Sequence, residues 1–272
     1  MKSLEDFSNF DISIFAQIQM ANNMQEELIP KHRKDMTRML DAIREIPGVM
    51  RDADLYADFR KLKREVIHKN KAFYIDPVWT IDKIPMEFRH DSFGLCEGKR
   101  LKFKGRYCTA IFDTQGDVMG FVGWDRDEDV KYLDSTNYGY KAKRTTFCGM
   151  DVLPKGYKQG YFVWVEGPVC KMYLEGFGLN VGSLLGSGMS DYVARIIRRF
   201  GSNAIIIPDK DDAGDKLVSL AKYLTPEARV YQSMIAKDID DTRLKMGNDL
   251  VVQELVNIIK DKRYKSEIFL RR

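Results

Sequence analysis

The residues best suited to carry chemistry are acids that follow three apolar segments in the second half of the chain. Glu166 follows YFVWV, Asp209 and Asp211 follow AIIIP, and Asp238 and Asp240 follow RVYQSMI after a short interval. Because Asp209 and Asp211 are two residues apart, an extended backbone would direct both side chains to the same side. Carboxylates this close repel one another unless a cation offsets their charge.

The elements that must position these acids are predicted from about residue 160 onward. Apolar runs alternate there with short amphipathic segments, a pattern typical of a parallel sheet covered by helices. The carboxyl ends of parallel strands lie at one edge of such a sheet. If the three strands are neighbours, the five carboxylates meet at that edge, where their hard oxygen atoms suit Mg²⁺ or Mn²⁺. Each acid taken alone could instead be a helix cap or a turn residue, as Asp212 and Asp215 could be.

Residues 1–70 are expected to form an N-terminal helical segment. KHRKDMTRMLDAIREI repeats apolar residues at intervals of three and four, and Pro47-Gly48 ends this helix. A second helix is expected from about Asp52 to Asn70. Its apolar side is predicted to consist of Leu55, Phe59, Leu62 and Val66. Basic and acidic residues balance here, so we expect packing against protein rather than binding of an anion.

Residues 71–158 are expected to form a small basic α+β subdomain, followed by the parallel sheet in residues 159–272. RYCTAIFD and VMGFVGW predict the two strands of a β-hairpin with a glycine turn. Two basic runs flank it, and they contain Lys99, Arg100, Lys102, Lys104 and Arg106 on one side and Lys143 and Arg144 on the other. One basic run is usually a solvated face, whereas two runs around one hairpin favour a nucleic-acid surface.

Composition excludes several classes of protein. The 272 residues carry a net charge of +4 and contain no apolar run long enough to cross a membrane. The acidic N-terminus differs from a signal peptide, so a cytoplasmic location is expected. The four cysteines form no CxxC pair, which argues against a structural zinc site and favours reduced, buried thiols.

The three acidic strand ends resemble the motifs of the TOPRIM domain, which primases, topoisomerases and some nucleases share. VEGP, DKD and KDIDD stand where the family has a motif glutamate (Glu166), a DxD pair (Asp209 and Asp211) and downstream acids (Asp238 and Asp240). Upstream, the hairpin and the segment VKYLDST are similar to the basic subdomain that precedes TOPRIM in bacterial and tailed-phage primases. The resemblance implies that Lys131 and, at the hairpin, Arg106 and Arg126 face nucleotide or template phosphates.

This resemblance implies a metal-dependent DNA primase that synthesises short RNA primers on single-stranded DNA from ribonucleoside triphosphates. Two departures are visible. Cys170 stands where primases usually have an acid, and the zinc ribbon that reads template in typical primases is not found, so a partner such as a replicative helicase is expected to help select template. Two alternatives stay open: a TOPRIM nuclease that uses the same acids, and a non-catalytic primase-like protein that binds nucleic acid.

Overall fold

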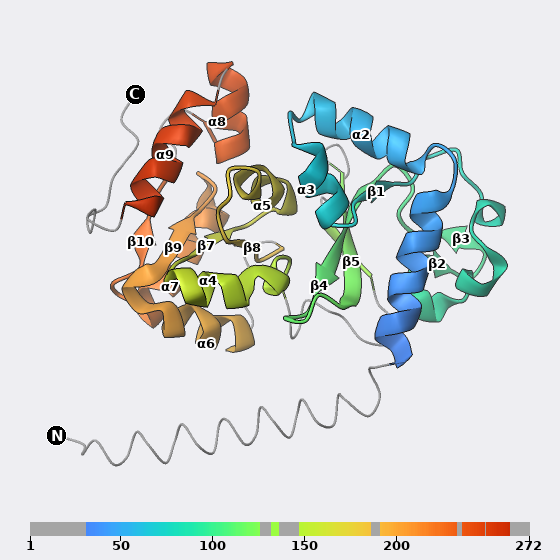
Figure 1. Cartoon of the computed structure of the whole chain (residues 1–272), viewed down its shortest axis with the longest axis horizontal. Coiled ribbons are helices and arrows are strands. Elements are labelled where there is room, and N and C mark those ends of the chain that lie inside the picture. The colour runs from blue at the N-terminus through green and yellow to red at the C-terminus, as the bar shows by residue number, and fades with distance from the viewer. Residues whose placement is uncertain are drawn as a thin grey trace, which may run out of the picture.

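The computed structural model describes residues 31–125, 132–135, 147–185, 191–232, 236–247 and 249–261. It contains two four-stranded sheets in two halves of the molecule (Figure 1), one parallel and one antiparallel. A further two-stranded hairpin lies beside the antiparallel sheet, formed by β2 (Cys96–Glu97) and β3 (Arg100–Leu101). None of the helices in the described residues is both long enough and apolar enough to cross a membrane.

The parallel sheet confirms the fold class expected for the second half of the chain. Its strands are β7 (Phe162–Val165), β8 (Val181–Ser183), β9 (Ala204–Ile207) and β10 (Arg229–Val230), in the order β10-β9-β7-β8. All three pairings are parallel. The three strands that precede the acids are therefore neighbours, which is the condition under which those acids meet at one edge.

Helices cover both faces of this sheet because its two central strands, β7 and β9, are apolar at every position. Phe162 and Trp164 face one side and pack with α4 (Leu153–Gln159), α6 (Asp191–Phe200) and α7 (Asp212–Leu224). Val163 and Val165 face the other side and pack with α5 (Pro168–Glu175) and α9 (Leu250–Lys260). Alternate residues of a strand point to opposite faces, so one apolar run supplies two cores.

The antiparallel sheet has the order β1-β4-β5-β6 and includes the predicted hairpin. Its strands are β1 (Phe73–Tyr74), β4 (Tyr107–Phe112), β5 (Val118–Trp124) and β6 (Tyr132–Asp134). In the turn between β4 and β5, the Asp113 carboxylate accepts hydrogen bonds from the N–H groups of Gln115 and Asp117. A helix formed by residues 31–45 packs Met39, Leu40 and other apolar residues on the core of this half.

The second N-terminal helix differs from the prediction in both length and face. It is divided into α2 (Val49–Phe59) and α3 (Arg64–Lys69), with Lys61 at a left-handed φ of 49° between them. Leu55 and Phe59, predicted to be buried, are 61% and 73% exposed. The smaller residues Ala53 and Ala57 face the protein instead, because α2 lies close to its neighbours.

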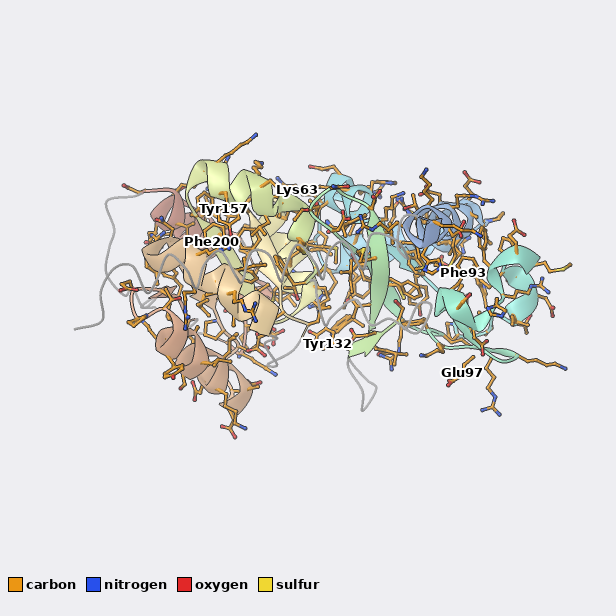
Figure 2. The ribbon with its side chains drawn as sticks, turned by 90° about the horizontal axis from the view of Figure 1, so that it is seen from below. Lys63, Phe93, Glu97, Tyr132, Tyr157 and Phe200 are labelled. Atoms are coloured by element: carbon orange, nitrogen blue, oxygen red, sulfur yellow. The ribbon has the colours of Figure 1, made fainter. Side chains whose placement is uncertain are left out.

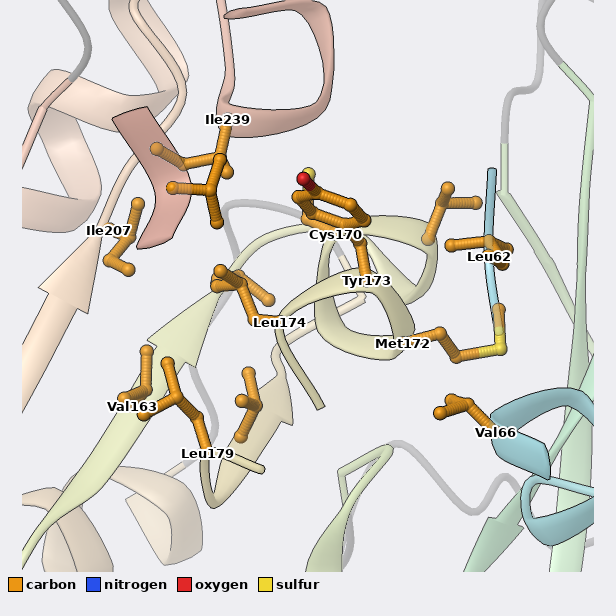
Figure 3. Packing of buried hydrophobic residues seen from close by; sticks show 14 of the residues in the cluster. Leu62, Val66, Val163, Cys170, Met172, Tyr173, Leu174, Leu179, Ile207 and Ile239 are labelled. Carbon is orange, nitrogen blue, oxygen red and sulfur yellow. The ribbon is translucent and has the colours of Figure 1, made fainter. Parts of the chain in front are cut away.

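The break between α2 and α3 brings the N-terminal helices against the parallel half. Leu62 and Val66 join the core that contains α5, where Met172 packs beside them (Figure 3). Further on, two helices that the sequence patterns did not indicate complete the fold, α4 and α8 (Ile239–Met246). The sequence predicts a strand over ARVYQSMI. Within the described residues, only Arg229–Val230 of this segment form a strand, β10.

Candidate active site

The ends of strands β7 and β9 and the loop that precedes α8 enclose a pocket of about 330 Å³. We call it the acidic pocket, because its lining contains five acidic residues from three separate segments: Glu166, Asp209, Asp211, Asp238 and Asp241. Residues from the other half of the molecule, including Trp124 of β5 and Tyr132 of β6, complete the wall. The pocket therefore lies where the two halves meet.

Glu166 and Asp209 are joined through the backbone at the ends of adjacent strands. Glu166 follows β7 directly and is only 7% exposed. Its Oε1 accepts a hydrogen bond of 3.2 Å from the Asp209 N–H, two residues after β9 ends. Ser183 at the end of β8 donates a 2.8 Å hydrogen bond to the Glu166 carbonyl and holds the exit of the strand. These contacts fix the position of the Glu166 side chain.

Asp211 begins helix α7 and at the same time faces a cation. Its Oδ1 accepts hydrogen bonds from the N–H groups of Ala213 and Gly214, which makes it the N-cap. Its Oδ2 lies 2.8 Å from the Lys237 Nζ. Gly214 permits the tight turn into the helix, because a Cβ at this position would lie 1.9 Å from the Asp209 carbonyl oxygen. Asp211 therefore combines the cap role with a place in the pocket.

The downstream acids Asp238 and Asp240 have different surroundings. Asp238 lines the acidic pocket and caps α8 by accepting a 2.6 Å hydrogen bond from the Asp241 N–H. Asp240 is fully buried, and its two carboxylate oxygens form ion pairs with Arg60 and Arg243. The expectation that Asp240 joins the other acids at the sheet edge is not met. The reason is that α8 turns its side chain toward the helices, where two guanidinium groups neutralise it.

Burial and mutual repulsion change the titration of the pocket carboxylates. Burial, together with Glu166 and Asp238, raises the pKa of Asp209 to about 7. Burial also raises the pKa values of Glu166 and Asp238. The pKa of Asp211 is lowered, first by its hydrogen bond with Lys237. A cation bound in the pocket would therefore stabilise the charged forms of Glu166, Asp209 and Asp238, whose charges the described residues do not fully neutralise.

The wall opposite the acids contains residues that sequence analysis did not select. Tyr132 packs on Gly167, where a Cβ would lie 2.5 Å from the tyrosine oxygen, so that position requires glycine. Tyr132 lies between the two halves of the molecule (Figure 2). Arg60, from the end of α2, stacks over the Trp124 ring at 5.3 Å. No local pattern marks Arg60 as functional, since its role follows from the contact between the N-terminal helices and the sheet.

Cys170 lies inside the acidic pocket, in the first turns of α5. Its side chain is 9% exposed, and burial raises the pKa of its thiol well above the usual range. A protonated thiol is a poor ligand for a hard divalent ion. The position therefore adds no charge to the pocket, in contrast to the acid that the primase motif has there. All four cysteines are free and buried, as expected.

The basic residues predicted to bind nucleic acid lie apart from the acidic pocket. Lys99, Arg100 and Lys104 are exposed in and around the β2–β3 hairpin, and Lys102 is half-buried. Glu97 marks this hairpin at the end of the molecule opposite Phe200 (Figure 2). Arg106 is buried beside β4. The remaining predicted residues lie outside the described part of the chain, namely Arg126, Lys131, Lys143 and Arg144.

The donor set of the pocket suits a divalent metal ion. The carboxylates of its lining offer the hard oxygen atoms that Mg²⁺ and Mn²⁺ prefer. The Lys237 ammonium stands within 4 Å of both Asp209 and Asp211, so a cation already occupies the place between them. In this arrangement no three acidic, imidazole or thiol side chains of the described residues form a complete metal-binding group. The donor atoms fit a divalent metal ion, and in this structure the Lys237 ammonium lies beside the carboxylates that would bind it.

Comparisons with known proteins agree with this arrangement. No family model matches the sequence. The chain is 26% identical to the DNA primase of Clostridium acetobutylicum over 58% of this chain and 28% of the relative. It is also 26% identical to the DNA primase of Aquifex aeolicus, over 93% of this chain and 55% of the relative. The chain therefore spans between about a quarter and about half of the length of these relatives.

Solved structures show the same fold. The Aquifex aeolicus primase structure, which comprises zinc-binding and RNA polymerase domains, superimposes with a TM-score of 0.67 and 23% identity, over 84% of this chain and 60% of that one. A DnaG primase catalytic domain bound to single-stranded DNA gives 0.62 and 21% identity, over 84% and 80%. The chain is thus similar in sequence to part of these DNA primases, and its fold is that of the primase catalytic core.

Proposed function

We propose that this chain is the catalytic core of a metal-dependent primase that joins ribonucleotides into short primers on single-stranded DNA. The observation that carries the proposal is the meeting of Glu166, Asp209 and Asp211 at the carboxyl edge of a parallel sheet, in a pocket closed by the antiparallel half. Sequence relationship to DNA primases supports the same activity. The substrates would be ribonucleoside triphosphates and a DNA template.

The metal would be Mg²⁺ or Mn²⁺, held by Glu166, Asp209 and Asp211, with Asp238 beside them. When bound, such ions activate a 3′-hydroxyl and neutralise the charge on a leaving pyrophosphate. We do not assign Asp240 to this set, because it is paired with two arginines. Asp240 instead anchors Arg60, whose guanidinium lines the pocket.

The residues of the chain itself would bind and orient the reactants. The 3.2 Å hydrogen bond from the Asp209 backbone to Glu166 holds two of the carboxylates in register before any substrate arrives. Tyr132, packed on Gly167, would exclude water from one side of the pocket and sets the distance between the two halves of the molecule there. Arg60 supplies positive charge on the opposite wall, where phosphate oxygens would lie.

Template binding is assigned to the basic residues of the antiparallel half. The exposed Lys99, Arg100 and Lys104 lie away from the acidic carboxylates, which would repel a phosphate backbone. That a similar primase domain was solved with single-stranded DNA supports a template site on this fold. Neutralising these three residues and Lys102 should weaken binding of single-stranded DNA. It should also reduce the slope of log K against log salt concentration by up to about 0.7 for each phosphate contact that is lost. An unchanged slope would show that this hairpin does not bind the template.

The central experiment compares primer synthesis by the wild-type chain and by an Asp209→Asn/Asp211→Asn variant. Purified protein is incubated with single-stranded DNA of mixed sequence, labelled ribonucleotides, and Mg²⁺ or Mn²⁺. The variant should lose activity by about 100-fold or more, because two oxygen ligands of the metal lose their charge. The matched control is Asp215→Asn, an exposed acid one turn further along α7 that should retain full activity.

Other outcomes would change the proposal. Metal-dependent cutting of the input DNA without new products would favour a nuclease that uses the same carboxylates. DNA binding with neither products nor cuts would favour a non-catalytic role. Full activity of the double variant would show that the reaction takes place elsewhere in the chain.

A further inference from the structure

Among the residues that the structure describes, Lys237 is the cation that forms ion pairs with the DxD carboxylates of the acidic pocket. Its Nζ lies 2.8 Å from Asp211 Oδ2 and 3.9 Å from Asp209 Oδ2. A single ammonium therefore lies between two carboxylates that are separated by one residue in sequence. Without it, the like charges of Asp209, Asp211 and Glu166 would repel one another in a partly buried site. Lys237 stabilises the acidic pocket in the absence of another cation.

The backbone of Lys237 is fixed, whereas its ammonium is not enclosed. The Lys210 N–H donates a 2.5 Å hydrogen bond to the Lys237 carbonyl, which ties the loop before α8 to the DxD loop. The next residue, Asp238, caps α8 and fixes the chain on that side. The Lys237 side chain is 42% exposed and lines the pocket. Its four-carbon stem can therefore move the charge within the pocket while the loop stays in place.

The second cation of the pocket wall, Arg60, is in a different situation. Its guanidinium is paired with the fully buried Asp240 and stacked on Trp124, and the side chain is 7% exposed. Moving it would leave Asp240 with Arg243 alone. Of these two cations, Lys237 is the one whose partners are carboxylates that a metal ion would also bind.

A divalent ion bound between Asp209 and Asp211 would compete directly with this ammonium. Carboxylate oxygens bind Mg²⁺ at about 2.0–2.1 Å, which brings both side chains around the ion. An ammonium left within about 4 Å of a double positive charge would be strongly repelled. Displaced from the carboxylates, the ammonium would still line the pocket, where it could bind the phosphate oxygens of a nucleotide.

We propose that Lys237 is a built-in counter-ion of the acidic pocket, which a divalent ion displaces and which then binds the phosphate groups of a nucleotide. This inference rests on the proposed metal site and assigns a role to a residue that it does not include. It predicts two effects of opposite sign when the charge is removed. Metal should bind more tightly, because its competitor is gone, and nucleotide should bind more weakly, because a phosphate ligand is gone.

The test measures binding of Mn²⁺ alone, followed by electron paramagnetic resonance, and binding of ATP in the presence of Mg²⁺, followed by calorimetry. Lys237→Met should bind Mn²⁺ about fivefold more tightly than wild type and ATP about fivefold more weakly, as expected for loss of one partly screened charge. Lys237→Arg keeps the charge and should stay near wild type in both. Thermal unfolding of each variant verifies that it is folded.

The outcomes separate this inference from the proposed function. If Lys237→Met binds Mn²⁺ as wild type does, or more weakly, the counter-ion role is wrong while the metal site stands. Tighter Mn²⁺ binding with unchanged ATP binding would overturn the phosphate role. If neither wild type nor Lys237→Met binds Mn²⁺, and Asp209→Asn/Asp211→Asn does not differ from them, both the metal site and this inference are wrong.

Discussion

The acidic pocket can be compared with a second charged cluster at the interface between α3 and α5. We call it the α3–α5 cluster, and it consists of Lys69, Asn70, Lys171 and Glu175. Here the Glu175 carboxylate accepts hydrogen bonds from all three partners, and Lys171 is fully buried at 2.7 Å from it. In the acidic pocket, the carboxylates outnumber the cations of the described residues, and Lys237 forms ion pairs with only Asp209 and Asp211.

The pKa values follow this difference. Lys171 and Lys69 hold the pKa of Glu175 at about 2 although burial acts in the opposite direction. The Asp209 pKa rises to about 7, because burial and its acidic neighbours outweigh Lys237. A carboxylate whose charge is neutralised inside the protein supports the fold, whereas a carboxylate left in excess is neutralised either by a proton or by a bound cation. The comparison therefore separates a cluster whose charges are neutralised within the protein from the pocket that is proposed to bind a metal.

The largest expected effect is on the α3–α5 cluster. Glu175→Gln leaves the buried Lys171 without its carboxylate and should lower the free energy of unfolding by about 3–5 kcal/mol. Urea denaturation at neutral pH measures this loss. Adding Lys171→Met should restore part of the stability, because the uncompensated charge is then removed. A loss below about 1 kcal/mol would mean that the cluster does not hold α3 against α5.

The two sites should respond to pH with opposite sign. Asp209, with its pKa raised above the unfolded value of about 3.9, destabilises the protein increasingly as pH rises from about 4 to about 7. In EDTA, Asp209→Asn should therefore gain up to about 4 kcal/mol over wild type at pH 8 and little at pH 4, since one pKa unit corresponds to about 1.4 kcal/mol. Urea denaturation at the two pH values measures the difference.

The same measurement on a Glu175→Gln variant serves as the comparison for that experiment. Its lowered pKa contributes stability that is present above about pH 4.3 and is lost as pH falls toward about 2. Glu175→Gln should therefore differ most from wild type at neutral pH and least in acid. Equal responses of the two variants to pH would contradict the distinction between the two sites.

A smaller effect is expected from changing the charge of the pocket itself. Cys170→Asp adds a carboxylate beside Asp209 and Asp238, and should lower the free energy of unfolding in EDTA by about 1–2 kcal/mol. The same variant should bind Mn²⁺ more tightly, since an oxygen donor replaces a protonated thiol. Cys170→Ser, which adds no charge, is the control for both measurements. If aspartate weakened metal binding, the cysteine position would lie outside the metal's reach.

Much of the fold could be predicted because local patterns specify it. The apolar strands of the second half, the β4–β5 hairpin and the reduced cysteines follow from composition and periodicity. The face of α2 could not be predicted in this way. Leu55 and Phe59 are more hydrophobic than Ala53 and Ala57, yet the alanines are buried, because close packing of the helix leaves room for small side chains only.

The candidate site likewise contains residues that the sequence predicts and residues whose place only the fold decides. Glu166, Asp209 and Asp211 were predicted from strand ends, and the fold brings them together because the strand order places β9 beside β7. Asp240 looks equivalent in sequence, since it follows Asp238 with the same spacing as the DxD pair. It lies elsewhere because α8 begins at Ile239, and a helix does not direct residues two apart to the same side.

The sequence by itself determined which residue types stand at the ends of the parallel strands, and hence the chemistry of the acidic pocket. Tertiary structure alone decided which charges neutralise one another. Arg60 and Asp240 are 180 residues apart, and Lys69 and Glu175 are 106 apart. Such pairs leave no local pattern, because their energy depends on burial and on distances that only the packing of α2 and α3 against the sheet establishes.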